Sequence, residues 1–141
     1  ERIYAAYDAQ DRLVGIALKA EATGYQDVIR ILYGYDPACQ CVTGIRVLKM
    51  AETPGLGDKI ATEPAFLENF KALDGTLNAT GDGLAHAIRT VKHGEKTQPW
   101  QIDAISGATI SSNAIGRMIN ASGQRMFPLI QRHLDALGAG G

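Results

Sequence analysis

The run from Asp103 to Thr109, Asp-Ala-Ile-Ser-Gly-Ala-Thr, places small residues and hydroxyl groups directly before a helical pattern. Its small residues let a bulky group approach the backbone closely, and Thr109 offers a hydroxyl. Ser111 or Ser112 can open the helix that follows, with its first N–H groups pointing back toward that hydroxyl. Unpaired donors and the helix dipole favour an anion there, so the run suits a phosphate. Taken alone, the same run is more often an ordinary turn and helix cap.

A second segment, Glu-Thr-Pro-Gly-Leu-Gly-Asp-Lys-Ile from Glu52 to Ile60, is rich in proline and glycine. Pro54, Gly55 and Gly57 provide tight backbone geometry with little side-chain bulk. Backbone amides in such a loop can approach a planar ring. The segment is therefore a second place where a cofactor can lie against the backbone.

The two segments together resemble the E-T-P-G-L-G loop and the D-x-x-[ST]-G-A-T sequence of FMN-binding domains of the RnfG/NqrC type. These domains occur in the G subunit of the Rnf electron-transport complex and in the C subunit of the sodium-translocating NADH:quinone reductase. The matches stand in the same order and about fifty residues apart, which is more specific than either match alone. The resemblance extends from roughly Gly24 to Ile119.

The resemblance implies that Thr109 carries covalent FMN through a phosphoester bond. A threonine hydroxyl needs a base or a metal to lose its proton, and no histidine adjoins the motif. The family solution is a separate magnesium-dependent flavin transferase, which splits FAD and leaves FMN on the threonine. Asp103 either helps that transferase to dock or caps the turn, and the residues favour neither interpretation.

The resemblance also implies further contacts with the flavin. Leu56 would supply an apolar wall, the backbone of Thr53 or Gly55 would supply donors, and Lys59 would offset negative charge. Each assignment has a structural alternative: Glu52 and Lys59 as the charged rim of a surface loop, Ser106 as a local turn bond, and Ser111 and Ser112 as caps. The full set of predicted cofactor-binding residues besides Thr109 is Ser106, Gly107, Ala108, Ile110, Ser111, Glu52, Thr53, Pro54, Gly55, Leu56, Gly57 and Lys59.

The function implied is an electron-transfer flavoprotein domain within an ion-translocating membrane redox complex, with the other subunits as partners. The chain shows no second set of acid, base or nucleophile, so we predict no catalytic residues and no activity of the domain alone. It also lacks a G-x-G-x-x-G sequence, which argues against direct NADH binding. The alternatives are an FMN-bearing module of a soluble or fused reductase for a small organic acceptor, and a flavin-free scaffold.

Length and composition are those of one folded domain. With 141 residues, 45% of them hydrophobic and 21% charged, we expect a single FMN-binding domain over residues 1–137 and a flexible tail over 138–141. The net charge of −1 gives no electrostatic reason to expect nucleic acid as a partner. Family members usually carry an N-terminal membrane helix, which this sequence does not show, so either that helix has been removed or this is a soluble relative. We expect a membrane-associated protein with its flavin domain on the periplasmic or extracytoplasmic side.

The cysteines and histidines show no spacing typical of a metal site. Cys39 and Cys41 lie in a turn, where we expect two incidental thiols, with a redox-active pair as the alternative. No metal is predicted, and His86, His93 and His133 show no partners in the sequence. Tyr25 and Trp100 are single aromatic residues, which are more often core residues than flavin-stacking partners.

The pattern of apolar residues predicts an α+β fold with an antiparallel-rich sheet flanked by helices. A helix is expected over Glu63–Phe70, and another from Ser112 with a stop at Gly123. A last helix is expected to begin near Pro128. The predicted strands are Ile3–Tyr7, Leu13–Ala20, Asp27–Tyr35, Cys41–Met50, His86–Val91 and Gln98–Asp103.

Overall fold

A computed structural model describes residues 3–23, 28–49 and 57–134 of the chain. Several predictions concern residues outside these ranges, namely Tyr25, Met50, Glu52, Thr53, Pro54, Gly55, Leu56 and the tail 138–141.

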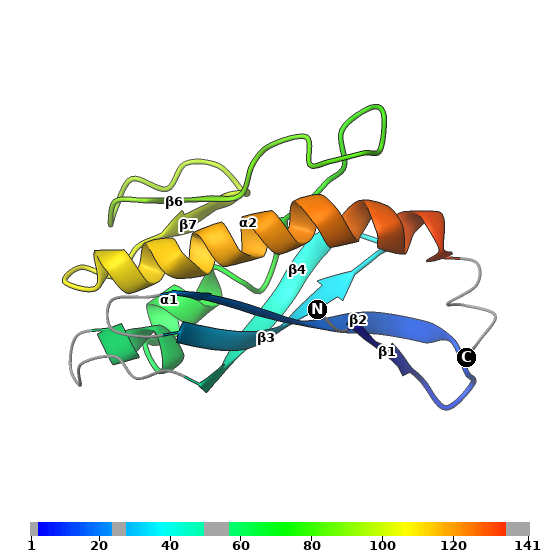
Figure 1. Ribbon diagram of the computed structural model, residues 1–141, viewed down its shortest axis with the longest axis horizontal. Coiled ribbons are helices and arrows are strands. Elements are labelled where there is room, and N and C mark those ends of the chain that lie inside the picture. The colour runs from blue at the N-terminus through cyan, green and yellow to red at the C-terminus, as the bar shows by residue number, and fades with distance from the viewer. Residues whose placement is uncertain (1–2, 24–27, 50–56, 135–141) are drawn as a thin grey trace.

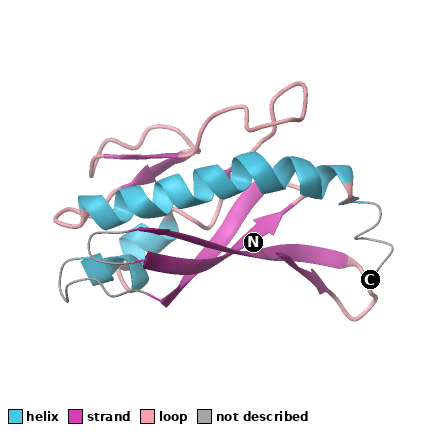
Figure 2. Ribbon diagram, in the orientation of Figure 1, coloured by secondary structure: helices cyan, strands magenta, loops and turns pink. Residues whose placement is uncertain are grey.

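The main sheet is an antiparallel meander, as the sequence predicted (Figures 1 and 2). Its spatial order follows the chain, so that each strand pairs with the next one along the sequence. Short turns, such as those between β1 and β2 and between β3 and β4, favour this arrangement. The strands are β1 (Ile3–Tyr7), β2 (Leu13–Thr23), β3 (Val28–Asp36), β4 (Cys41–Lys49) and the short β5 (Leu73–Asp74).

The alternation of side chains along β3 determines which face of the sheet is buried. Ile29, Ile31, Tyr33 and Tyr35 point to one face and are at most 1% exposed. Arg30 lies on the other face, where its guanidinium pairs with a glutamate of β2. Every second residue of β3 is therefore buried, as the alternation of apolar residues in the sequence predicted.

A single long helix, α2 (Thr109–Arg132), covers the buried face of the sheet. The predicted break at Gly123 and the separate helix from Pro128 are wrong, because the chain stays helical through both residues. Gly123 is buried against Phe127, where a Cβ would come within 2.9 Å of the ring. Pro128 lacks an N–H, but its buried neighbours Phe127 and Ile130 hold this part of the helix in the core.

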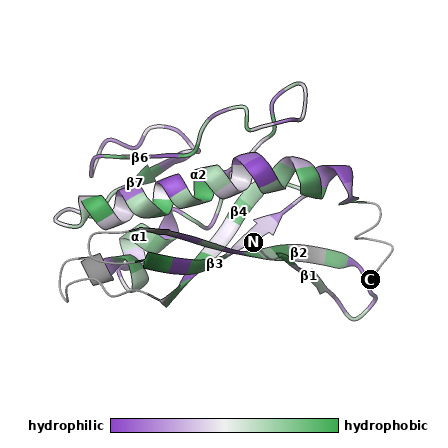
Figure 3. Ribbon diagram, in the orientation of Figure 1, coloured by the Kyte–Doolittle hydropathy of each residue, from purple (hydrophilic) through white to green (hydrophobic). Residues whose placement is uncertain are grey.

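Two short strands, β6 (Arg89–Val91) and β7 (Gln101–Asp103), pair in parallel on the other side of α2 (Figure 1). Gly116 makes this packing close, since a Cβ there would lie 3.2 Å from the backbone nitrogen of Thr90. The helix is therefore sandwiched between two sheets. Figure 3 shows both hydrophobic and hydrophilic positions along α2, as expected of a helix that is covered on some of its sides.

Both short strands are shorter than predicted, because side chains take over the backbone hydrogen bonds before them. The Ile88 N–H donates to Asn120 Oδ1 of α2 at 2.9 Å. The N–H groups of Thr97 and Gln98 both donate to Gln101 Oε1, at 2.8 and 3.1 Å. Residues 86–88 are consequently irregular, and residues 98–100 form a bend and a turn rather than a strand.

The connection from β4 to β5 holds the small helical elements of the fold. It contains a 3-10 helix, η1 (Gly57–Ala61), and the short helix α1 (Pro64–Glu68). Pro64 opens α1, as predicted. Both elements contact β4, and η1 also contacts α2.

Candidate functional site

The candidate site begins with a tight turn over Ile105–Ala108, directly before α2. The Ala108 N–H donates to Ile105 O at 3.0 Å and closes the turn. Gly107 occupies the third position with a φ of 84°, in the left-handed region that a type II turn requires there. Glycine adopts this conformation without steric cost, which explains its place in the motif.

The helix starts at Thr109 rather than at Ser112, so the prediction that Ser111 or Ser112 opens it is wrong. Ala108 is the N-cap residue, and it provides no side-chain cap. Ser112 instead lies buried inside the first turn, where its Oγ donates to Ala108 O at 2.8 Å and accepts the Ile105 N–H at 3.1 Å. Ser112 therefore joins the turn to the helix.

The N-terminus of α2, which is the positive end of the helix dipole, has no side-chain cap. The first intrahelical hydrogen bond runs from Ser112 N–H to Ala108 O, at 3.0 Å. The N–H groups of Thr109 and Ile110 precede this bond and therefore have no acceptor within the helix. No acidic side chain occupies the first turn of this 24-residue helix. A helix end of this kind favours an anionic group.

Exposure separates the predicted site residues around this helix end. Thr109, Ser106 and Gly107 are exposed, and Ile110 is 53% exposed. Ala108 is buried and contributes to the core. Ser111 is also buried, at 1% exposure, so its hydroxyl does not share the surface with that of Thr109.

The second predicted segment enters the described structure at Gly57, the first residue of η1. Ile60 anchors η1 in the hydrophobic core, and Lys59 is half-buried in its last turn. η1 contacts α2 and, in Figure 1, lies at the end of the molecule where α2 begins. The described part of this segment is thus on the same side as Thr109.

Asp103 acts as a turn-forming residue in the structure. Its Oδ1 accepts the Gly94 N–H at 2.7 Å, and its Oδ2 lies 3.4 Å from His93 Nδ1. His93 Nδ1 also lies 3.0 Å from Ala104 O. His93, for which the sequence showed no partner, thus contacts two residues at the end of β7 and just after it. These contacts support the turn interpretation of Asp103, while its role in transferase docking stays a prediction.

Asn69 is a polar residue of this region that sequence reasoning missed. It is 7% exposed, and its Oδ1 accepts the Asp103 N–H at 3.0 Å while its Nδ2 donates to Phe66 O at 2.9 Å. An asparagine between Glu68 and Phe70, at the end of a predicted short helix, was the only signal in the sequence. A shallow pocket of about 300 Å³ lies here, lined by Ala65, Glu68, Asn69, Gly94, Lys96 and Asp103.

Trp100, His86 and His133 were not predicted as site residues, and the structure shows their surroundings. Trp100 is half-buried rather than a full core residue, and it stacks on His86 with ring centroids 3.7 Å apart. His133 is the C-cap residue of α2. Within residues 3–23, 28–49 and 57–134, no group of three or more histidine, cysteine, aspartate or glutamate side chains is placed to hold a metal ion.

An FMN-binding domain family model matches residues 24–123, which is most of the chain. The chain belongs to the FMN-binding domain family. The resemblance to the RnfG/NqrC type is confirmed, since its relatives are named as G subunits of ion-translocating oxidoreductase complexes and a solved structure similar to it is NqrC. Two of them are the G subunits of the ion-translocating oxidoreductase complex of Methanosarcina acetivorans, 36% identical over 112 residues, and of the Na(+)-translocating ferredoxin:NAD(+) oxidoreductase complex of Acetobacterium woodii, 33% identical over 111.

These relatives are longer proteins. The alignments cover 79% and 78% of this chain, but 51% and 48% of the two relatives. The chain thus spans about half the length of the curated relatives it matches. Among the described residues, no helix has the combined length and apolarity needed to cross a bilayer.

Solved structures confirm the predicted fold class. NqrC of Shewanella oneidensis matches this FMN-binding domain with a TM-score of 0.75 and 25% identity, over 98% of this chain and 61% of that one. The C subunit of the Na(+)-translocating NADH-quinone reductase of Parabacteroides distasonis matches with a TM-score of 0.67 and 21% identity, over 96% and 61%. The second likeness concerns the fold alone.

Proposed function

We propose that this domain carries FMN covalently, through a phosphoester bond to the Thr109 hydroxyl. The observation that carries the proposal is the position of Thr109, exposed at the uncapped start of a 24-residue helix. A phosphate on Thr109 would lie next to N–H groups that precede the helical pattern and at the positive end of the dipole. Gly107 leaves open space beside it, since a Cβ there would meet nothing within 4 Å.

Other residues of the chain would hold the rest of the cofactor. Lys59 lies in an element that contacts α2 and would offset the phosphate charge. The loop from Glu52 to Gly57, which leads into η1, would supply backbone donors and the Leu56 side chain for the flavin ring. Ser106 would bind the phosphate or the ribityl chain from the exposed turn.

The domain itself would contribute to an ion-translocating membrane redox complex. Its relatives are named as subunits of such complexes, and bound FMN accepts and returns electrons. The protein would hold and tune the flavin, while neighbouring subunits supply and remove the electrons. We place the flavin domain on the periplasmic or extracytoplasmic side, and attribute attachment to a magnesium-dependent flavin transferase.

The attachment is tested by intact mass after co-expression with a flavin transferase. We expect one added FMN phosphoester, located on the peptide that contains Thr109. Thr109→Ala should abolish the added mass while leaving the thermal unfolding midpoint nearly unchanged, because the side chain is exposed. Thr43→Ala is the control, since it removes an exposed threonine hydroxyl of β4, outside the proposed site, and should retain the flavin. Flavin on another residue would refute the assignment.

The carrier role is tested separately with the flavin-loaded domain. We expect little oxidation of NADH when NADH is the only electron donor, because the domain needs its neighbouring subunits. Rapid turnover of NADH with a small organic acceptor by these 141 residues would instead establish the reductase alternative.

A further inference from the structure

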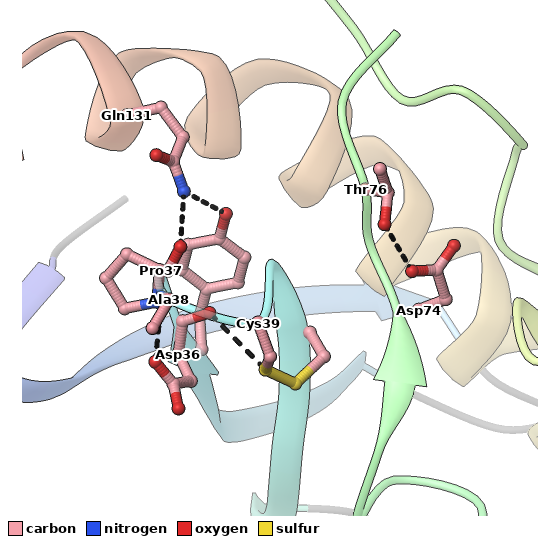
Figure 4. The surroundings of a disulfide bond; sticks show 9 residues. Asp36, Pro37, Ala38, Cys39, Asp74, Thr76 and Gln131 are labelled. Atoms are coloured by element: carbon pink, nitrogen blue, oxygen red, sulfur yellow. Dashed lines mark hydrogen bonds between the residues drawn. A yellow bond between two sulfur atoms is a disulfide. The ribbon is translucent and has the colours of Figure 1, made fainter.

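The turn between β3 and β4 contains a disulfide bond that joins Cys39 to Cys41 (Figure 4). The expectation of two incidental thiols is therefore wrong. Gln131, near the end of α2, donates to Pro37 O of this turn at 3.0 Å. At a rise of 1.5 Å per residue, Gln131 lies roughly 33 Å along the helix from Thr109. The disulfide is thus remote from the candidate flavin site.

The bond has two properties of a reducible disulfide. It closes a loop with a sequence separation of only two residues, and such a short loop constrains the unfolded chain little. Cys39 is also exposed, whereas Cys41 is half-buried in β4, so a reductant can reach the Cys39 sulfur. Exposed disulfides are the ones that thiols reduce readily.

The residue inside this loop has an unfavourable backbone conformation. Gln40 has a φ of 52°, in the left-handed region. Glycine or asparagine is common at such positions in hairpin turns, whereas a long side chain with a Cβ is disfavoured. The disulfide links the two residues that flank Gln40. This link restrains the backbone of Gln40 and helps to hold its left-handed conformation.

Gln40 in turn holds the start of the segment that follows β5. Its backbone oxygen accepts the Gly75 N–H at 2.9 Å, and its Oε1 accepts the Leu77 N–H, also at 2.9 Å. Gly75 packs against Phe127 of α2, where a Cβ would lie 2.8 Å from the ring. The conformation of Gln40 is therefore linked to the packing of residues 75–77 on the helix.

We propose that Cys39 and Cys41 form a second redox centre, a disulfide that external thiols reduce and that controls the hold of Gln40 on residues 75–77. The reductant is a dithiol, or two molecules of a monothiol. This centre is independent of the flavin and of the function proposed above.

The exchange balances as a two-electron reaction. A thiolate of the reductant attacks the exposed Cys39 sulfur, the disulfide bond breaks, and Cys41 leaves as a thiolate that takes a proton from water. The second thiol of the reductant then attacks its own sulfur in the mixed disulfide and releases Cys39. The protein gains two electrons and two protons, and the reductant becomes a disulfide. Cys39 Sγ lies 3.6 Å from Asp36 O, so the released thiol has an acceptor in place.

The first experiment measures the redox equilibrium of the purified domain. The protein is equilibrated with buffers of graded ratios of reduced to oxidised glutathione and then quenched with acid. Free thiols are alkylated, and the mass of the intact protein gives the reduced fraction. We expect at least half of the molecules to be reduced in a buffer as reducing as the cytosol. A disulfide that survives this buffer and yields only to excess dithiothreitol would overturn the proposal, as would free thiols in the air-exposed protein.

A matched pair of variants tests the link to Gln40. Gln40→Gly and Gln40→Ala both remove the side-chain acceptor for the Leu77 N–H. They differ only in the Cβ that disfavours the left-handed conformation. We expect the disulfide of Gln40→Gly to be roughly tenfold harder to reduce than that of Gln40→Ala. Equal equilibria would show that the disulfide does not hold this conformation.

Amide hydrogen exchange measures the effect on the neighbouring segment. On reduction, the Gly75 and Leu77 amides should exchange at least about tenfold faster, because their acceptors lie on Gln40. The Ile88 amide, which donates to Asn120, is the internal control and should not change. The variant Cys39→Ser with Cys41→Ser should show the fast exchange without any reductant. Slow exchange in that variant would overturn the control of residues 75–77.

Discussion

Four hydroxyl side chains lie between Ser106 and Ser112, and burial assigns them different roles. Ser106 and Thr109 are exposed, whereas Ser111 and Ser112 are at most 1% exposed. A modifying enzyme can reach only the exposed pair. Of these two, only Thr109 belongs to the helix whose N-terminus favours a phosphate. Exposure and helix position together favour Thr109 as the attachment site.

We expect Ser112→Ala to destabilise the fold although Ser112 has no place in the proposed attachment. The variant leaves the N–H of the buried Ile105 without its acceptor at 3.1 Å, which should cost about 1–3 kcal/mol in the free energy of unfolding. Urea unfolding measures the loss. Ser106→Ala is the control and should change the free energy by less than about 0.5 kcal/mol. Equal effects would contradict the role of Ser112.

Gly107 tests the backbone of the attachment turn. Gly107→Ala meets no atom within 4 Å, so any loss of stability comes from its φ of 84°. We expect a loss of about 1–2 kcal/mol in urea unfolding. Gly44→Ala is the matched control, because Gly44 also has open space but lacks a positive φ, and it should be tolerated. A tolerated Gly107→Ala would contradict the requirement for glycine in this turn.

At the scale of elements, α2 shows where local sequence signals fail. Glycine and proline usually end helices, and Gly123 and Pro128 therefore predicted two short helices. In the structure both residues are buried, and Gly123 accommodates the ring of Phe127. The Phe127 ring also stacks on Tyr35 of β3, with centroids 4.0 Å apart. Tertiary packing, which the local sequence does not show, keeps the helix continuous.

Gly123→Ala should destabilise the domain even though alanine favours helices. The new Cβ would come within 2.9 Å of the Phe127 ring, and Gly75 and Tyr35 prevent the ring from moving away. We expect a net loss of about 1–3 kcal/mol in chemical unfolding. Ala121→Gly, at an exposed position of the same helix, isolates helix propensity and should cost about 1 kcal/mol. Stabilisation by Gly123→Ala would show that the core can adjust.

The strands show which parts of the fold the sequence could predict. The runs of apolar residues predicted β1 to β4, and the alternation along β3 predicted its buried face. The short turns between the runs predicted their antiparallel order. The strands β6 and β7 were predicted as longer segments, but their parallel pairing with each other was not, since two isolated short strands carry no local signal of their partner. The position of this pair depends on Gly116 and Thr90, whose contact with each other is tertiary.

At the scale of the whole molecule, the candidate site depends on contacts that no motif contains. The two motifs predicted Thr109 and the approach of η1 to α2. The contacts that hold the segment leading into the turn come from elsewhere: Asn69, at the end of α1, accepts the Asp103 N–H, and His93, after β6, lies against Ala104 O. The sequence around Asn69 and around His93 does not predict these contacts, since each residue acts through a hydrogen bond to a segment distant in the sequence.

The sheet and α2 are also joined by buried tyrosines. Tyr33 Oη lies 2.5 Å from Ser122 Oγ, and Tyr35 Oη accepts from Gln131 Nε2 at 3.0 Å. Burial raises the pKa of both Tyr33 and Tyr35 above the ordinary value of 10.0. Both side chains are therefore held neutral between the two layers, and their ionisation opposes folding.

This arrangement predicts a specific loss of stability at alkaline pH. Because the folded pKa of Tyr33 lies above the unfolded value, its contribution is complete below pH 10.0 and falls as the pH rises toward the folded pKa. Each such tyrosine should lower the free energy of unfolding by about 1.4 kcal/mol per pH unit in this range. Tyr33→Phe should reduce the slope by that amount, measured by urea unfolding at graded pH. Ser122→Ala loses the same hydrogen bond but keeps the titrating group, so its slope should match the wild type. Equal slopes in Tyr33→Phe and Ser122→Ala would show that Tyr33 does not oppose alkaline folding.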